Sequence, residues 1–391
     1  MGKLVTEVNE KVGDDTYLLM SVTSGVGLVL QVEKFGREIA GDSYKNYIVI
    51  RKYDFAYNKS ATKQFPEGYL CMLSEYEAAA IPKSIFTCFR IIDSECYPDF
   101  LDYLFHNNYH GRWLRKYIEV GARAHGSLSI DTKYLWMMPI AMPCLREQQK
   151  IADCLASVDV LIKAETKKLE LLKKYKRGLM QKLFPAQGKT VPEWRFREFR
   201  DCGEWEETVL EKVSYYENGK AHENSIEENG TYIVVNSKFI STDGAIKKYS
   251  NAADMLAARG DILMVLSDVP NGKALAKCYF VRLNNTYTVN QRVCRLTPHN
   301  VNGVLLFYIL NRNAYFLRFD DGVKQTNLKK ADVLSCLILI PKTKEEQQKI
   351  ADVLSETDAV ITAQSNKIKN LRRHKKGLMQ GLFPSSAEVD E

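Results

Sequence analysis

Short clusters of hydrogen-bonding side chains in this sequence could recognise the edges of DNA bases. Arginine and lysine suit guanine, asparagine and glutamine suit adenine, and serine or threonine can pair with either. Such residues gather in loop-like stretches in both halves of the chain. The candidate DNA-binding residues are Asn271, Lys273, Asn290, Gln291, Arg292, Lys324, Gln325 and Asn327 in the second half, and Lys59, Lys63, Arg112, Arg115, Arg123, His125 and Ser127 in the first.

Each candidate has a plainer interpretation as a residue of a solvated loop or helix. Arg112 and Arg115 suit phosphate better than base edges, or they only solvate a helix. Arg123 and Lys324 form the best correspondence between the two halves, because each lies two positions after a glycine. The candidate loops taken together are therefore a stronger indication of DNA contact than any single residue in them.

Motifs for covalent chemistry are missing from the sequence. The stretch 188–190 reads Gly-Lys-Thr, but Leu183 stands where a phosphate-binding loop needs its first glycine. No glycine-rich nucleotide or S-adenosylmethionine loop follows a predicted strand. His106 and His110 lack the adjacent glutamate of a zinc-protease pair, and we interpret them as surface histidines, with Asp99 as a helix N-cap. We expect no catalytic residues, no metal site and no cofactor.

Composition limits the class of protein. A length of 391 residues predicts two or three domains, and a net charge of +7 is compatible with a polyanionic partner without requiring one. The nine cysteines contain no Cys-x-x-Cys pair, which favours a reducing, cytoplasmic environment over a disulfide framework. No apolar run reaches about 18 residues, so we expect no membrane span.

One long segment occurs twice. The stretch beginning at Gln148 returns at Gln347, an offset of 347 − 148 = 199, and the offset holds without a gap to the end of the repeat. About half of the repeated positions are identical. The segments that precede the two copies share much less. A repeat of this length predicts a duplicated scaffold that carries two different heads.

Each copy predicts a long helix with an apolar seam. Apolar positions recur in alternating steps of four and three from Ile151 to Leu183 and from Ile350 to Leu382, so each helix needs a partner, most simply the other copy. Glu165 and Gln364 occupy the same seam slot and would meet if the helices run antiparallel, fixing register; alternatively the seam opens to water there. The charge runs at 167–176 and 372–376 are typical of solvated faces, although near a duplex they would add salt-sensitive affinity.

The two heads are predicted to be mixed α/β domains that share a fold. Strand-like runs occur at 46–50, 231–235 and 261–265, and helix-like stretches at 99–117 and 304–317. Several residues of head 1 match residues of head 2 of the same type. The difference in residue number between the matched residues changes gradually along the chain, as loops of unequal length would produce. The matched pairs are Tyr17 with Tyr232, Asp54 with Asp261, Arg90 with Arg295, and Tyr103 with Tyr308.

We expect an α+β protein with two heads joined by two helices in an antiparallel, intramolecular coiled coil with pseudo-two-fold symmetry. The expected segments are a first head at 1–143, a helix at 144–185, a linker and second head at 186–341, a second helix at 342–384, and a disordered tail at 385–391.

These features together resemble the DNA-specificity subunit of type I restriction-modification systems. The resemblance covers nearly the whole chain. It is carried by both copies of Glu-Gln-Gln-Lys-Ile-Ala, at 147–152 and 346–351, by the blocks at 177–185 and 376–384, and by the head 2 opening at 195–199 with Trp205. Head 1 has no comparable tryptophan-containing lead-in, so its opening segment is shorter.

The resemblance implies a non-catalytic subunit in which each head reads one half of a split, asymmetric site in double-stranded DNA. It implies that the helices set the spacing and dock two methyltransferase subunits, with a translocating nuclease subunit as a further partner. Adenine methylation and S-adenosylmethionine would belong to the transferase. Independently, a helix of roughly 55 Å matches about 16 base pairs. Two alternatives remain: a protein-interaction scaffold with a coiled-coil spacer, and an enzyme with an unrecognised site.

Overall fold

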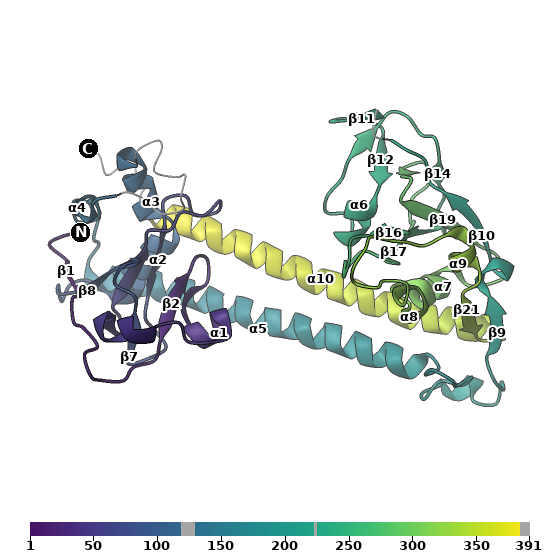
Figure 1. Cartoon of the computed structure of the whole chain (residues 1–391), viewed down its shortest axis with the longest axis horizontal. Helices are drawn as coiled ribbons and strands as arrows, with labels where there is room; N and C mark the ends of the chain where they lie inside the picture. Colours follow the sequence, from purple (N-terminus) through teal and green to yellow (C-terminus); the bar gives the residue numbers. More distant parts are fainter. Residues whose placement is uncertain (119–129, 223–224, 384–391) are drawn as a thin grey trace. The chain divides into compact units, whose positions relative to one another are not determined.

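The chain divides into two compact units, each of which contains one head and parts of both long helices. The structure, a computed structural model, describes residues 1–118, 130–222 and 225–383. Unit 1 comprises 1–167 and 366–391, and unit 2 comprises 168–365. The expected helices are α5 (Leu145–Leu183) and α10 (Lys344–Leu382), each 39 residues long (Figure 1). Together with the β-rich heads they confirm the predicted α+β class.

Within each unit, segments of α5 and α10 pack against each other in opposite directions. In unit 1, Asp159 contacts Lys375 and Glu165 contacts Lys367. Residue numbers therefore increase along α5 in the direction in which they decrease along α10, so the two segments are antiparallel. In unit 2, Lys176 contacts Asp358, and Leu183 shares a core with Ile350. The seam positions predicted from the heptad pattern are buried or half-buried in both helices, as apolar stripes facing a partner helix require. The meeting of Glu165 with Gln364 stays a prediction.

The central sheet of head 1 is antiparallel and four-stranded, in the order β1-β8-β5-β6. Its strands are short, and the helices α2 and α3 cover it with an aromatic core that includes Phe55, Phe89 and Phe105. Two antiparallel strand pairs, β2 with β3 and β4 with β7, pack against it through a second hydrophobic core. The strands are β1 (Val5–Glu7), β2 (Met20–Thr23), β3 (Gly27–Leu30), β4 (Ile48–Arg51), β5 (Phe55–Asn58), β6 (Tyr69–Met72), β7 (Ala78–Ile81) and β8 (Phe86–Ile91).

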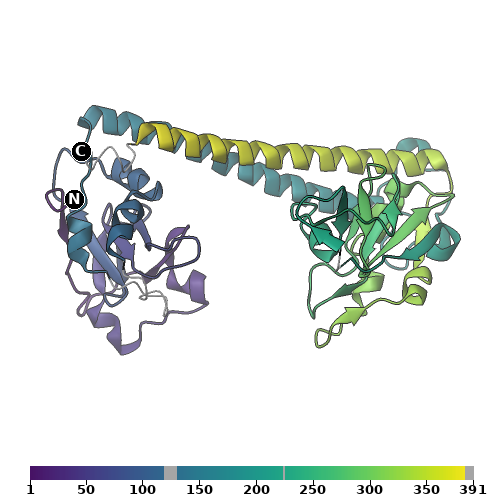
Figure 2. The same cartoon turned by 90° about the horizontal axis from the view of Figure 1, so that it is seen from above.

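The central sheet of head 2 repeats this topology in the order β10-β19-β15-β17, and a five-stranded sheet, β11-β13-β12-β18-β14, packs beside it. The N-terminal part of α10 runs along this head (Figure 2). The strands are β9 (Glu206–Val209), β10 (Ser214–Asn218), β11 (Ile226–Glu227), β12 (Tyr232–Val235), β13 (Tyr249–Ser250), β14 (Leu256–Ala257), β15 (Ile262–Val265), β16 (Ser267–Asp268), β17 (Cys278–Phe280), β18 (Tyr287–Val289), β19 (Val293–Pro298), β20 (Thr326–Asn327) and β21 (Leu337–Ile340).

The residue echoes between the heads correspond to equivalent structural positions. Asp54 precedes β5 and binds Arg90 of β8 through two hydrogen bonds of 2.7 Å. Asp261 precedes β15 and lies 3.9 Å from Arg295 of β19. The match of Tyr17 with Tyr232 agrees with the strand pairing of the two heads. Two residues after each tyrosine, Leu19 pairs in parallel with Ala80, and Val234 pairs in parallel with Thr288. The predicted duplication of the head fold is therefore present at the level of strand register.

The predicted head helices are each broken into two. In head 1 the break lies between α2 (Pro98–His106) and α3 (Tyr109–Leu114), where Asn108 has a φ of 57°. In head 2 it lies between α7 (Gly303–Leu310) and α8 (Ala314–Leu317), where Arg312 has a φ of 59°. A left-handed residue ends a helix. Asp99 is not the N-cap of α2: Tyr97 caps it and Pro98 takes the first helical position, for which a fixed φ suits proline.

The shorter helices complete the heads. They are α1 (Gln31–Phe35), α4 (Thr132–Trp136), α6 (Ser237–Ser241) and α9 (Lys330–Leu334), with 3-10 turns at 41–46, 115–117, 197–199 and 210–212. In head 1, α4 precedes α5, and in head 2, α9 precedes β21 and then α10.

The lead-in of head 2 is anchored on the start of α10. β9 pairs antiparallel with β21, and the Arg195 guanidinium makes two hydrogen bonds of 2.7 Å with the Glu346 carboxylate. Both side chains are buried, and the Trp205 indole donates to Glu346 over 3.4 Å. The matching residue of the first repeat, Glu147, is exposed. In head 1, the Met1 amino group donates to the Met138 carbonyl over 2.7 Å.

Candidate nucleic-acid interface

Three predicted clusters of head 2 are neighbours, although they are distant in the sequence. β16 pairs antiparallel with β20, with Ser267 opposite Asn327. The Leu266 N–H donates to the Arg292 carbonyl over 2.9 Å, and the Leu328 N–H donates to the Leu266 carbonyl over 2.8 Å. The short segment at 266–268 therefore lies between the turn at 290–292 and the segment at 324–328. This arrangement brings the candidate residues of head 2 onto one loop surface.

The turn at 268–273 is closed by its own aspartate. The Asp268 carboxylate accepts hydrogen bonds from the backbone N–H groups of Val269, Ala274 and Leu275 at 2.9, 2.6 and 3.1 Å, as aspartates in tight turns commonly do. Asn271 has a φ of 54°, and its Nδ2 donates to the Gly322 carbonyl over 3.3 Å. Asn271 therefore ties this turn to the neighbouring segment, while Lys273 is exposed.

The segment at 320–327 is ordered by a second aspartate. The Asp321 carboxylate accepts from the N–H groups of Lys324 and Val323 at 3.0 and 2.9 Å, and these bonds lower the pKa of Asp321. Gln325 donates from Nε2 to the Ser267 hydroxyl over 2.7 Å. The side chains of Lys324, Gln325 and Asn327 are exposed on this ordered backbone, which suits base or phosphate contacts.

A cavity of about 410 Å³ adjoins these loops in head 2. Asn290 and Arg292 line it together with residues that the sequence analysis did not single out, because they lie more than 40 positions away. Gly219 allows this approach, since a Cβ there would overlap the Asn290 carbonyl. The lining residues are His222, Ile226, Val234, Asn236, Ser237, Lys238, Lys248, Asn290 and Arg292.

The candidates of head 1 divide into exposed lysines and partnered arginines. Lys63 is exposed and Lys59 half-buried in the β5–β6 connection. Arg115 lies 2.6 Å from the buried Glu67 carboxylate. Arg112 lies over the Tyr109 ring, 5.7 Å from its centroid. Three further candidates lie outside the described residues: Arg123, His125 and Ser127.

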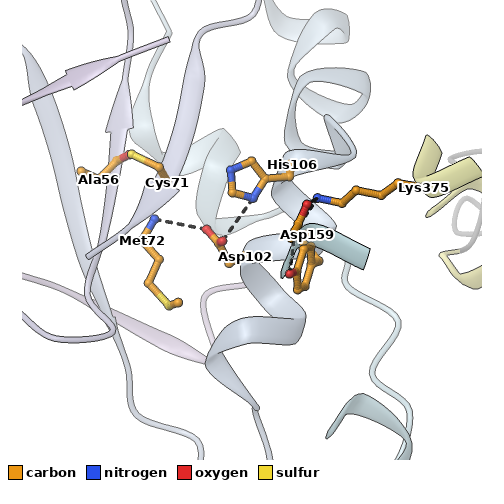
Figure 3. A network of polar contacts seen from close by, with 8 residues as sticks. Ala56, Cys71, Met72, Asp102, His106, Asp159 and Lys375 are labelled. Atoms are coloured by element: carbon orange, nitrogen blue, oxygen red, sulfur yellow. Dashed lines mark hydrogen bonds and ion pairs between the residues drawn. The ribbon is translucent and has the colours of Figure 1, made fainter. Parts of the chain in front are cut away.

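His106 and His110 are not both on the surface, contrary to the sequence prediction. His110 is only 2% exposed and lies beside the Tyr57 and Phe105 rings, and burial lowers its pKa to about 4. The His106 ring lies 3.1 Å from Asp102 (Figure 3). Burial opposes protonation of His106, but the hydrogen bond and charge of Asp102 raise its pKa above the ordinary value. Among the described residues, no group of three or more histidine, cysteine or acidic side chains could hold a metal.

Each head is tied to both long helices by a tyrosine, an aspartate and a lysine, which we call the triad. In unit 1, the Tyr103 hydroxyl donates to Asp159 Oδ2 over 2.9 Å. Lys375 Nζ lies 2.7 Å from both Asp159 oxygens (Figure 3). The Lys375 ammonium also lies 5.0 Å from the Tyr103 ring centroid. Burial, followed by the bond to Asp159, raises the pKa of Tyr103, so its hydroxyl stays a donor.

Unit 2 contains the same triad. The Tyr308 hydroxyl donates to Asp358 over 2.7 Å, and Lys176 lies 2.6 Å from that carboxylate and 5.0 Å from the Tyr308 ring centroid. The lysines in these two triads are only 22% and 21% exposed. Their assignment to solvated charge runs is therefore wrong, because a carboxylate and an aromatic face hold each one in place.

The repeated glutamines join the heads to the helix starts in the same duplicated manner. Gln148 Oε1 accepts from the Tyr97 N–H over 2.8 Å, and Gln347 Oε1 accepts from the Asn302 N–H over 2.9 Å. Tyr97 and Asn302 are the N-caps of α2 and α7. Each glutamine thus satisfies a backbone donor at a helix start, where intrahelical partners are missing. The repeated motif therefore serves to attach a head to its helix.

Comparison with known proteins agrees with these features. Residues 203–373 match the type I restriction modification DNA specificity domain. The chain is 26% identical over 291 residues to the type I restriction enzyme MjaVIII specificity subunit of Methanocaldococcus jannaschii, covering 70% of this chain and 68% of that protein. It is 35% identical over 101 residues to the putative MjaX specificity subunit of the same organism, covering 25% and 23% respectively.

Two solved structures share the fold. The type I restriction-modification S subunit from M. genitalium superposes with a TM-score of 0.59 at 15% identity, covering 97% of this chain and 93% of that one. A chain from a structure that describes complex assembly and conformational transition of the type I R-M system has a TM-score of 0.54 at 16% identity, covering 98% and 96%. In the described residues, no helix is both long and apolar enough to span a bilayer.

The two heads share one central-sheet topology, and each is tied to both repeated helices, an architecture that the two solved structures share. The resemblance first seen in the repeated motifs is confirmed. Residues 203–373 match the DNA specificity domain of type I restriction-modification systems, and the chain as a whole is similar to specificity subunits of that class.

Proposed function

We propose that this chain is the non-catalytic sequence-reading subunit of a type I complex. Residues 1–143 and 186–341 would each read one half of an asymmetric, bipartite site in double-stranded DNA. The helices at 144–185 and 342–384 would set the spacing between the halves. The observation that carries the proposal is the convergence of 268–273, 290–292 and 324–327 on one loop surface of head 2, with exposed side chains of base-reading types.

The helices would also dock two methyltransferase subunits. Large apolar side chains are exposed at matching positions of the repeat: Leu161 is 42% exposed and Val360 is 50% exposed. Matching exposed apolar positions on both copies suit two copies of one partner. The transferase would supply S-adenosylmethionine and the adenine chemistry, and a translocating nuclease would join the same assembly. All nine cysteines are free thiols, which fits a cytoplasmic location.

A binding series with and without the methyltransferase subunits tests the reading function. We expect weak DNA binding by the chain alone and specific binding by the complex, with affinity that falls steeply in log[salt]. Sequence-blind binding by the full complex would reject the proposal. No binding even at low salt would favour a protein-interaction scaffold instead, and DNA cleavage or methyl transfer by the chain alone would indicate an enzyme.

Methylome sequencing of a host that carries the chain and its transferase tests the bipartite site. We expect a split motif with modified adenines on opposite strands. Exchange of residues 1–143 for those of a relative should change one half of the motif and leave the other half and the spacing unchanged. A change in both halves would show that the heads do not read independently.

A further inference from the structure

The described lining of the head 2 cavity carries three cationic side chains and no carboxylate, and the Asp254 carboxylate lies 3.9 Å from the His222 ring. The cations are Lys238, Lys248 and Arg292. None of these three cations forms an ion pair with a described acidic residue, whereas many other surface lysines of the chain do. Unpaired cations around a concave surface concentrate positive potential and attract anions.

The neutral side chains of the cavity also present donors. Asn236 Oδ1 accepts from the Phe239 N–H over 2.9 Å, and Asn290 Oδ1 accepts from the Arg292 N–H over 3.4 Å. Because a backbone N–H must face an oxygen, these bonds fix the amide orientation and leave each NH₂ group as the unpaired end among the described residues. The ligand that fits such a site is an anion that only accepts hydrogen bonds.

The cavity does not suit an extruded base. No phenyl, phenol or indole ring is among its described lining residues, and both nitrogens of the buried His222 ring are engaged, by the Lys220 carbonyl at 2.7 Å and the Thr288 hydroxyl at 2.8 Å. Proteins that hold a single-stranded base stack it on aromatic side chains, and those that flip a base hold it between aromatic or apolar ones. Among the described lining residues of this cavity, only Ile226 and Val234 are apolar. A phosphate needs cations and donors alone, which is what this cavity offers.

We propose that this cavity binds the DNA backbone phosphate that flanks the half-site read by head 2. The proposal rests on the proposed DNA-reading function. It adds that different residues of head 2 contact the bases and the phosphate backbone. Arg292 joins the two parts, since its side chain lines the cavity and its carbonyl accepts from Leu266 beside β16 and β20. The loops at 268–273 and 324–327 would contact base edges. Lys238 and Lys248 would bind the backbone phosphate and so fix the register of head 2 on the duplex.

Adjacent lysines provide a matched test. Lys247 and Lys248 are both exposed, but only Lys248 lines the cavity. In the complex with methyltransferase subunits, Lys248→Gln should reduce the slope of log K against log[salt] by about 0.9. It should weaken cognate and non-cognate DNA by the same factor and leave the methylated motif unchanged. Lys238→Gln should act alike, and Lys247→Gln should leave the slope at the wild-type value.

The possible results separate this proposal from the reading function. A Lys248→Gln slope equal to that of Lys247→Gln overturns the phosphate site, and so does a changed base in the motif of Lys248→Gln, which would make the lysine a base reader. If the wild-type complex itself fails to prefer its cognate site, the reading function fails before the variants are compared. Cognate preference with a reduced Lys248→Gln slope supports both.

Discussion

The Tyr103 hydroxyl donates to the Asp159 carboxylate over 2.9 Å, and this bond joins a head helix, α2, to a repeated helix, α5. The same bond joins Tyr308 of α7 to Asp358 of α10 over 2.7 Å. In both places a lysine from the other repeated helix completes the triad. The duplication therefore preserved an attachment between head and helices, whereas the candidate DNA-binding loops differ between the two heads.

Loss of the aspartate should loosen this attachment. Asp159→Asn removes the charge that holds Lys375, and because the pair is partly exposed we expect destabilisation of about 1 kcal/mol in urea unfolding. Asp358→Asn should cost a similar amount. A double-mutant cycle of Asp159→Asn with Tyr103→Phe should give non-additive losses. Glu170→Gln, on the exposed face of α5, is the control; an equal loss there would exclude a specific role for the triad.

The buried pair of Arg195 and Glu346 should matter more. Glu346→Gln would leave the Arg195 guanidinium, only 6% exposed, without its anion. We expect a loss of about 3–5 kcal/mol in the free energy of unfolding, read by circular dichroism during urea denaturation. Glu147→Gln changes the same slot of the first repeat, where the side chain is exposed, and should stay within about 0.5 kcal/mol. Equal effects at both positions would contradict the anchoring role of the lead-in.

Burial of His110 predicts acid sensitivity of head 1. The pKa of His110 is lowered to about 4 in the fold, while the unfolded chain binds this proton near pH 6.5. Its contribution to stability is therefore present above pH 6.5 and is lost as the pH falls towards 4. Between pH 7 and pH 5 the loss should be about 2 kcal/mol.

The variant His110→Phe isolates this contribution. Its urea midpoint should fall less than that of the wild type between pH 7 and pH 5, because an apolar ring binds no proton. His374→Gln, at an exposed position of α10, should follow the wild-type pH profile. Parallel profiles for His110→Phe and wild type would contradict the burial of a neutral imidazole.

Matching apolar positions on the helices should control assembly. Leu161→Asp and Val360→Asp are expected to weaken binding of the methyltransferase subunits by tenfold or more, because each places a charge in a buried interface. Sedimentation or light scattering of the mixed subunits would measure the stoichiometry. Leu171→Asp is the control, since Leu171 is 58% exposed but its counterpart in the second repeat is polar Asn370. Full assembly by both test variants would show that the methyltransferase subunits do not dock at Leu161 and Val360.

Local periodicity accounts for what could be predicted. The heptad steps from Ile151 to Leu183 and from Ile350 to Leu382 identify the buried face of each helix, because residues three and four apart share a face of any α-helix. The echo of Tyr103 in Tyr308 was visible for a similar reason, since a duplicated fold keeps its anchoring residues at a nearly constant offset. The two heads and the paired helices were therefore readable from the chain alone, and the class of the protein came from the resemblance that the repeated motifs carry.

Contacts between distant segments were decided only by the tertiary structure. Nothing local to Lys248 distinguishes it from Lys247, yet only one of them lines the cavity beside Arg292. His110 looked like a surface residue until Tyr57 and Phe105 were brought around it. The physical reason is the same in both cases: strand pairing and core packing join residues that the sequence separates by tens of positions, and the exposure and charge environment of a side chain depend on those neighbours.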